Sequence, residues 1–481
     1  MKILRHTVFN LVGLGAPLLV AVGTIPVLIH ELGPARFGLL TLIWAVVSYF
    51  GLFDLGLGRA LTQQLAVVFA NKEDEKVGPL VATATVLMAM LGLLAGVLMA
   101  ATASWGVSLI HEVPDRREAV NAVYAMALAM PFIVLTSGFR GILEARDAFG
   151  IINLIRLPMG LFTFLGPLAV VLYAQPARLD YIAWILVAGR VIACGVHGYY
   201  AWRVLPRERI IFTWKANLLK PLSVSGGWLT VSNIVSPFMG YVDRFVIGAI
   251  VSASAVAYYA TPQELVTKLW IVPGALTAVL FPAFATQMAR RDEQTWVLFG
   301  KAVYWLFMAL LPLTVALSLF AHDLLVLWIN SAFADQSTGL MRVFAIGILI
   351  NCLAHVPFTL IQSAGAARLT ALAHLIELPL FLGALWWLTS VHGILGAAIA
   401  WLLRMTLDAF LMFILCSPLL GRSVKSIFSI KVFALGFLAL LGFSGSMISS
   451  LNIRIVWMFL MIFALAWPAM ISWQSFRSRS I

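Results

Sequence analysis

Charged residues are scarce in this chain. Only 11% of its 481 residues are Asp, Glu, Lys or Arg, while 62% are hydrophobic. Water-soluble domains contain about 25% charged and about 45–50% apolar residues. So few polar residues cannot cover the surfaces of the two or three soluble domains that this length would form. The composition therefore excludes such a protein, and it predicts an integral membrane protein.

Cysteine is also scarce. The three cysteines, Cys194, Cys352 and Cys416, lie far apart in apolar segments, so no metal-binding spacing or disulfide framework is visible. The 32 Lys and Arg residues outnumber the 20 Asp and Glu residues, but they form no cluster typical of a nucleic-acid-binding face. We therefore predict no metal site, no cofactor and no nucleic-acid partner.

Long polar segments are missing as well. The longest connection between apolar runs, residues 203–222, is basic and amphipathic, which favours a position on the anionic inner leaflet of a membrane. There is no room for a catalytic domain outside the membrane. We predict no catalytic residues and no enzymatic activity.

Apolar runs of sufficient length recur along the whole chain. A bilayer crossing needs roughly 20 mostly apolar residues, and this criterion predicts about fourteen transmembrane helices and an all-α fold. The predicted spans cover residues 7–29, 38–57, 79–103, 119–138, 157–175, 180–202, 222–249, 257–285, 302–320, 338–363, 370–389, 393–416, 432–450 and 455–474.

The positions of the basic residues predict the orientation of these spans. Cytoplasmic loops carry an excess of Lys and Arg. With the N-terminus inside, 22 of the 32 basic residues fall in cytoplasmic segments and six in outer ones. We therefore expect both termini in the cytoplasm.

Three sequence matches indicate an internal repeat. They follow the same order in both halves, at separations of 226, 221 and 214 residues. The matched positions are Pro131 with Pro357, Pro158 with Pro379, and Arg190 with Arg404. A repeat of six helices returns the chain to the same side, so the copies are parallel and related by a pseudo-two-fold axis along the membrane normal. Two-lobed carriers share this architecture. We expect lobes at residues 1–220 and 221–416, and two added helices in residues 417–481.

Ionisable residues inside spans are costly and mark functional sites. Arg190 and Arg404 occupy matching positions of the repeat, and together they favour binding of a phosphate or pyrophosphate. The structural alternative is that Arg404 pairs with Asp408 one turn away. Asp243 and Arg244 are adjacent, so they point in different directions and need other partners or access to water.

Other ionisable residues of the predicted spans have functional and structural interpretations. His374 and Glu377 share a helix face and can form a proton relay or a satisfied polar pair. Glu264 and Lys268 favour an intrahelical ion pair. Asp54, with Gly51, Gly56 and Gly58 around it, suits a hinge and gate; the alternative is a helix end anchored by Arg59.

Three stretches resemble bacterial polysaccharide flippases. These proteins belong to the multidrug/oligosaccharidyl-lipid/polysaccharide exporter superfamily. The first stretch, residues 28–66, contains Leu32-Gly33, Phe37-Gly38 and Asp54-Leu55-Gly56-Leu57. The second, residues 233–265, contains "YVDRFVIG" and "AYYATPQEL", and residues 271–285 ("IVPGALTAVLFPAFA") resemble the end of the family's eighth helix.

This resemblance implies movement of isoprenoid-pyrophosphate-linked oligosaccharides across a bacterial cytoplasmic membrane by alternating access, for O-antigen, exopolysaccharide or capsule synthesis. It implies Arg190, Arg404 and Arg244 as head-group ligands, and Asp54, Asp243, Asp408 and Glu377 as residues for gating or ion coupling. The expected partners are the lipid-linked oligosaccharide, membrane lipids, polymerase or export machinery, and a coupling proton or sodium ion. The rival interpretations are a drug/cation antiporter or another carrier of this superfamily, and a membrane-embedded transferase.

Overall fold

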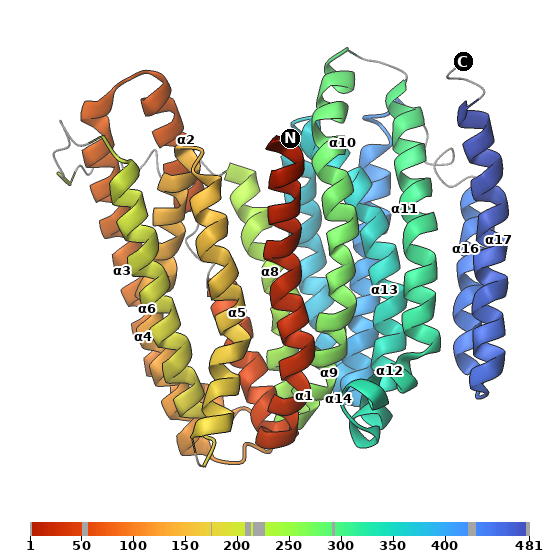
Figure 1. Ribbon diagram of the computed structural model, residues 1–481, viewed down its shortest axis with the longest axis horizontal. Helices are drawn as coiled ribbons and strands as arrows, with labels where there is room; N and C mark the ends of the chain where they lie inside the picture. The colour runs from red at the N-terminus through yellow and green to blue at the C-terminus, as the bar shows by residue number, and fades with distance from the viewer. Residues whose placement is uncertain are drawn as a thin grey trace. The chain divides into compact units, whose positions relative to one another are not determined.

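The protein is helical throughout the part described by a computed structural model (Figure 1), which covers residues 2–50, 56–174, 176–206, 213–214, 227–290, 294–421 and 430–477. The prediction of an all-α membrane protein is confirmed. The α-helices are α1 (Lys2–Phe50), α2 (Leu57–Ala70), α3 (Asp74–Ser108), α4 (Arg116–Ala145), α5 (Phe149–Tyr173), α6 (Leu179–Val204), α8 (Gly227–Ile250), α9 (Ala253–Thr267), α10 (Ile271–Arg290), α11 (Gln294–Leu319), α12 (Ala321–Trp328), α13 (Ser331–Ser363), α14 (Ala367–Cys416), α16 (Ile430–Ser444) and α17 (Leu451–Arg477). Two 3-10 turns, η2 (Lys268–Trp270) and η3 (Gly445–Met447), complete the order.

Two of these elements each contain two successive helices. Gly33 in α1 has φ 75° and ψ 160°, and Gly393 in α14 has φ 59° and ψ −139°. Both conformations suit glycine alone, because it has no Cβ to clash with the backbone. With α1 and α14 divided there, and with α9, η2 and α10 taken as one segment, the longer helices follow the order of the predicted spans, whereas the short helices α2 and α12 have no predicted span of their own. Nine helices of the described residues are long and apolar enough to cross a membrane.

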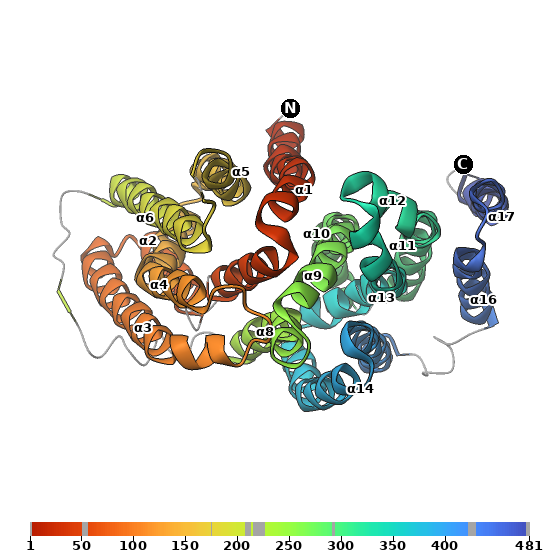
Figure 2. The same ribbon diagram turned by 90° about the horizontal axis from the view of Figure 1, so that it is seen from below.

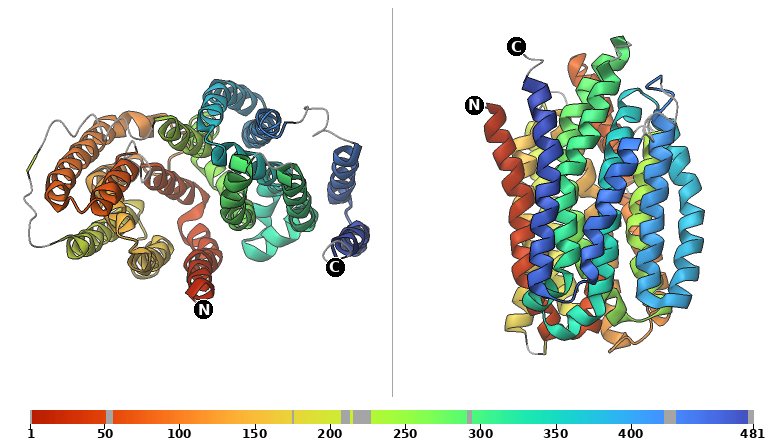
Figure 3. Two further views of the ribbon diagram at one scale, coloured as in Figure 1. Left: turned by 90° about the horizontal axis from the view of Figure 1, so that it is seen from above. Right: turned by 90° about the vertical axis from the view of Figure 1, so that its right-hand side faces the viewer.

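The chain divides into two compact units, Met1–Ala257 (unit 1) and Tyr258–Ile481 (unit 2). The lobe boundaries expected at residues 220 and 416 stay a prediction. In unit 1, α4 packs against α2, α3 and α6, and these helices run side by side when viewed along their axes (Figures 2 and 3). In unit 2, α13 holds the corresponding central place among α10, α11, α12 and α14.

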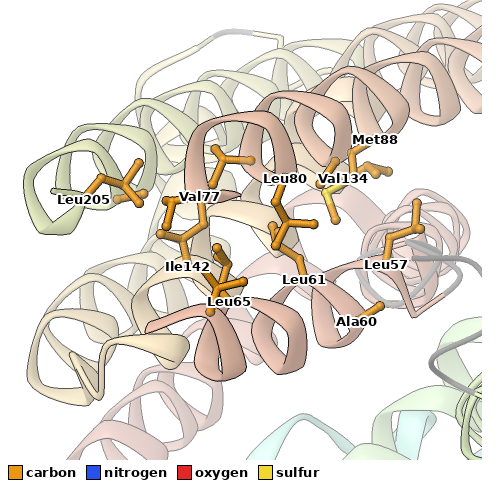
Figure 4. Packing of buried hydrophobic residues seen from close by; sticks show 14 residues of the cluster. Leu57, Ala60, Leu61, Leu65, Val77, Leu80, Met88, Val134, Ile142 and Leu205 are labelled. Atoms are coloured by element: carbon orange, nitrogen blue, oxygen red, sulfur yellow. The ribbon is translucent and has the colours of Figure 1, made fainter. Parts of the chain in front are cut away.

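A hydrophobic cluster joins four helices of unit 1. Figure 4 shows side chains of α2, α3 and α4 facing one another, with Leu205 next to the end of α6. Leu65, Val77 and Ala84 are fully buried there. Burial of a Val or Leu side chain contributes about 1.5–3 kcal/mol in water, whereas in lipid the close packing itself holds helices together.

Apolar side chains also cover the outside of the helices. On α3, Leu93, Leu94 and Val97 are 58%, 56% and 64% exposed, and Trp387 on α14 is 66% exposed. Monomeric soluble proteins rarely expose large contiguous apolar surfaces. A hydrocarbon surrounding stabilises such surfaces, which agrees with a multi-pass membrane protein.

Buried polar contacts fix one end of unit 1. Glu118 of α4 is 3% exposed and pairs with Arg36 of α1 at 3.0 Å. The other carboxylate oxygen of Glu118 accepts a hydrogen bond from the backbone N–H of Leu179, where α6 begins. The turn before α4 also joins the turn after α8, since the His111 N–H donates to Gly248 and the His111 carbonyl accepts from Ala253. The starts of α4 and α6, the part of α1 after Gly33 and two turns therefore meet at this end of unit 1.

The last two helices pack against α11 of unit 2. Arg454 of α17 forms an ion pair of 2.6 Å with Asp323 of α12, and its Nη1 also donates to the Leu319 carbonyl at 2.6 Å. Arg454 is 7% exposed. The pair therefore anchors the added helical hairpin to the rest of unit 2.

The structure explains two of the glycines near the start of α2, Gly56 and Gly58. Gly56 is the residue before α2 and has φ 78°, so the chain bends there. A Cβ on Gly141 of α4 would lie 2.7 Å from the carbonyl oxygen of Gly58, which shows that α2 and α4 approach closely at this point. Asp54 lies outside the described residues, so its gating role stays a prediction.

Candidate functional site

Four ionisable side chains of unit 2 form a buried cluster on the two halves of α14. His374 and Glu377 come from the half before Gly393, and Arg404 and Asp408 come from the half after it. The chain reverses between them, so residues some thirty positions apart come together. His374, Glu377 and Arg404 are 6%, 1% and 8% exposed. We call these four residues the ionic cluster.

Short distances connect the members of the ionic cluster. The Nε2 atom of His374 lies 3.8 Å from Oδ1 of Asp408. One ring nitrogen of His374 and one carboxylate oxygen each of Glu377 and Asp408 lie within 4.8 Å of one another. Arg404 interacts electrostatically with all three. The sequence paired His374 with Glu377 and Arg404 with Asp408, and the structure brings both pairs into one site.

Glu377 is the unusual member of the cluster. Both of its carboxylate oxygens are buried and accept no hydrogen bond from the described residues. An ionised carboxylate in such a place is costly, because burial removes its hydration. With His374 neutral, one arginine against two carboxylates leaves one negative charge. One proton or one monovalent cation would balance that charge if both carboxylates were otherwise ionised.

Aromatic rings line the cluster on two sides. The Arg404 guanidinium lies over the Phe381 ring, 5.4 Å from its centroid. His374 stacks with Phe358 of α13, with centroids 6.4 Å apart and planes 25° apart. Rings exclude water and lower the local dielectric constant, so charges in this site interact more strongly than they do in water.

A hydrogen-bond chain links the cluster to the interruption in the segment from α9 to α10. Asn351 of α13 donates from Nδ2 to Oδ2 of Asp408 at 3.3 Å, and Trp270 of η2 donates from Nε1 to Oδ1 of Asn351 at 2.8 Å. The sequence analysis did not identify Asn351 or Trp270 as site residues. An amide within the apolar run "AIGILINCLAH" was the available signal, since polar side chains inside spans usually bond across helices.

Asp243 and Arg244 lie in α8 of unit 1. Asp243 is fully buried and Arg244 is 4% exposed. The backbone N–H of Arg244 donates to Oδ1 of Asp243 at 2.8 Å, and the Arg244 guanidinium lies 5.3 Å from the centroid of the Tyr241 ring. Burial of two adjacent charged side chains makes α8 a second candidate region, separate from the ionic cluster.

Arg190 lies in α6 of unit 1. Its side chain is half-buried, and no described residue gives it an ion pair or hydrogen bond. Its expected counterpart in the repeat, Arg404, has two carboxylates beside it. The third expected pair is confirmed, since Lys268 Nζ lies 3.1 Å from Glu264.

The sequence comparisons agree with this architecture. The family model described as "Polysaccharide biosynthesis protein" matches residues 3–288. A candidate O-antigen transporter of Shigella flexneri is 30% identical over 413 residues, which cover 86% of this chain and 97% of that protein.

Solved structures share the fold. A multidrug resistance MATE family transporter of the MOP superfamily, in an inward-facing conformation, superimposes with a TM-score of 0.73 over 85% of this chain and 94% of the other, at 14% identity. An outward-facing structure gives 0.61 over 87% and 95%, at 16% identity. A MOP superfamily transporter from Pyrococcus furiosus, described as having a binding pocket of reverse polarity, gives a TM-score of 0.57 over 86% of this chain and 96% of the other, at 16% identity.

The fold is that of a multi-pass membrane protein with the architecture of MOP superfamily transporters. The family match and the relative make the assignment narrower. The chain belongs to the polysaccharide biosynthesis protein family, the polysaccharide flippases of the multidrug/oligosaccharidyl-lipid/polysaccharide exporter superfamily.

Proposed function

We propose that the protein moves isoprenoid-pyrophosphate-linked oligosaccharides from the inner to the outer leaflet of a bacterial cytoplasmic membrane, by alternating access, during synthesis of O-antigen, exopolysaccharide or capsule. The match over 413 residues to a candidate O-antigen transporter carries this proposal. A polar head group cannot cross hydrocarbon unaided, because its hydration is lost there. A protein that replaces this hydration lowers the barrier without breaking a bond.

Three arginines are proposed to compensate the charge of the pyrophosphate. Arg190 is the strongest candidate, since no described residue neutralises it. A guanidinium binds phosphate oxygens through two parallel hydrogen bonds. Arg244 and Arg404 are the other candidates, and the carboxylates beside Arg404 make its charge available only when they are neutralised.

The acidic residues are proposed to couple this movement to an ion gradient. The burial of Glu377, which is 1% exposed, and the closeness of Asp408 to it in the ionic cluster support this role. Binding of one proton or one sodium ion removes that charge and frees Arg404 for an anion. Asp243 is proposed for coupling in unit 1 and Asp54 for gating.

The orientation with both termini in the cytoplasm stays a proposal that follows from the distribution of basic residues. Cysteines introduced at Ser223 and Ser478 should resist labelling by an impermeant maleimide in intact cells. Efficient labelling at either position contradicts the proposed orientation. Polymerase and export machinery that use the flipped oligosaccharide are the proposed partners.

The deciding experiment deletes the gene in its host and measures two quantities. We expect loss of surface polysaccharide and accumulation of lipid-linked oligosaccharide in the inner leaflet. Wild-type protein should restore export, and Glu377→Gln should restore less at equal abundance in the membrane. Unchanged surface polysaccharide together with a higher sensitivity to cationic dyes would instead identify a drug exporter of the same superfamily.

A further inference from the structure

The Trp270–Asn351 hydrogen bond fixes how the Asn351 amide faces the ionic cluster. An indole N–H only donates. The atom 2.8 Å from Trp270 Nε1 is therefore the amide oxygen of Asn351, and the NH2 group faces Oδ2 of Asp408 at 3.3 Å. Trp270 thus holds the only oxygen of this side chain away from the carboxylates.

This orientation decides what the ionic cluster can bind. Hard metal cations bind oxygen atoms, and an amide ordinarily offers one. Here the amide presents donor hydrogens to Asp408, and the Arg404 guanidinium adds further donors and a positive charge. An alkali cation would meet these donors directly, whereas a proton needs only one carboxylate oxygen. Glu377 offers two buried oxygens without a hydrogen-bond donor among the described residues.

We propose that Trp270, acting through Asn351, selects a proton over an alkali cation at the Glu377–Asp408 pair. The inference deepens the proposed function, since it names the ion that the coupling site takes. Trp270 and Asn351 are positioning residues here, because neither receives the ion.

The neighbouring ionisable side chains do not supply a further oxygen ligand for a cation. On the side of α9 and η2, Lys268 is held by Glu264 at 3.1 Å. On α13, His355 lies one turn from Asn351 and is half-buried. On α14, His374 contacts Asp408 with a nitrogen atom. None of the side chains of Lys268, His355 and His374 carries an oxygen atom. Asn351 does, and rotation of its side chain can turn that oxygen toward the carboxylates.

Trp270 lies at a break in the helical segment, where a local rearrangement can change its hydrogen bond to Asn351. Trp270 belongs to the 3-10 turn η2, which interrupts the apolar segment between α9 and α10. Such interruptions often mark functional hinges. Both η2 and α10 pack against α13, so a rearrangement at the interruption changes the hydrogen bond that orients Asn351.

The test measures binding of 22Na⁺ to the purified full-length protein at neutral pH, with no glycan present. Trp270→Phe keeps an aromatic side chain and removes the indole N–H that donates to Asn351. The Asn351 amide is then free to turn its oxygen toward the ionic cluster. We expect the apparent Na⁺ affinity to rise about fivefold, the change that corresponds to the net contribution of one hydrogen bond between protein groups. Protons should compete with this binding, and Trp270→Phe combined with Glu377→Gln should lose it. The exposed Trp386 of α14 provides the matched control, Trp386→Phe, which should bind as wild type does.

A second variant tests the same idea without removing the indole. Asn351→Asp places an oxygen toward Asp408 while another still accepts from Trp270, so Na⁺ affinity should rise there too. Equal Na⁺ affinity in wild type, Trp270→Phe and Asn351→Asp overturns the proposal, at whatever affinity this occurs. Failure of the proposed transport function appears elsewhere, as unchanged surface polysaccharide in the deletion strain, so the two failures are distinguishable.

Discussion

Arg190 in unit 1 and Arg404 in unit 2 occupy matching positions of the predicted repeat, yet their surroundings differ. Arg404 is 8% exposed and lies among Glu377, Asp408 and His374. Arg190 is half-buried, and no described residue pairs with it. Unit 1 keeps a compensated ion pair at one end, Arg36 with Glu118. Unit 2 holds the four ionisable side chains of the ionic cluster between the two halves of α14, in addition to the ion pair of Arg454 with Asp323.

The roles proposed for the two arginines follow this difference in surroundings. A cation without a partner binds an anion from outside the protein, because the anion supplies the missing neutralisation. A cation beside carboxylates instead sets how many further charges the site accepts. We infer that unit 1 contributes mainly to holding the head group, and that unit 2 contributes mainly to ion coupling.

The largest effect is expected for Arg404→Ala. It leaves two buried carboxylates without their cation, and removal of one partner from a buried ion pair costs about 3–5 kcal/mol in the free energy of unfolding. Thermal unfolding of the purified protein should show a marked loss of stability. Combining Arg404→Ala with Glu377→Gln restores the net charge and should recover much of it. Equal stability of the single and the double variant would contradict the charge balance described above.

Arg190→Ala should affect transport and leave stability nearly unchanged. Loss of a charged hydrogen bond to the transported head group, about 1.5–3 kcal/mol, corresponds to a fall in export of about tenfold or more. The assay compares surface polysaccharide with membrane abundance. Arg190→Lys should restore part of the export, since it keeps the charge and loses the planar fork. Normal export in Arg190→Ala would remove this residue from the site.

Glu118→Gln should cost stability without changing ion selectivity. The amide keeps an oxygen for the Leu179 N–H but loses the charge that attracts Arg36. A loss of about 1–2 kcal/mol in the free energy of unfolding is expected. The apparent Na⁺ affinity of this variant should equal that of wild type. A changed affinity would show that the end of unit 1 influences the ionic cluster.

The smallest effect is expected for Lys268→Met. Lys268 and Glu264 form an intrahelical pair, with both side chains 41% exposed, and exposed ion pairs contribute at most about 1 kcal/mol. Export and thermal stability should both stay close to wild type. A large loss of export at unchanged abundance would assign Lys268 to the transport pathway and weaken the contrast between the units.

Much of the fold was predictable because a membrane restricts it strongly. Backbone groups in hydrocarbon must bond within the segment, so long apolar runs become helices. The predicted spans 180–202 and 338–363 correspond to α6 (Leu179–Val204) and α13 (Ser331–Ser363). The Glu264–Lys268 pair was predictable for a similar reason, since residues four apart in a helix are neighbours.

The candidate site was predictable only in part. Arg404, Asp408 and Glu377 were recognisable as charges inside apolar runs. Their meeting with Asn351 and Trp270 was not, because the two hydrogen bonds join residues 81 and 57 positions apart, and periodicity carries no information on which helix faces meet.

The sequence by itself determined that this chain is a helical membrane protein with charges buried in its spans, because composition and run length follow directly from the solvent in which the protein folds. The tertiary structure decided which of those charges are compensated. It placed two carboxylates and a histidine beside Arg404, left Arg190 without an ion pair from a described residue, and turned the Asn351 amide toward Asp408. Electrostatic and hydrogen-bond energies depend steeply on distance and orientation, and only packing sets these for residues far apart in the chain.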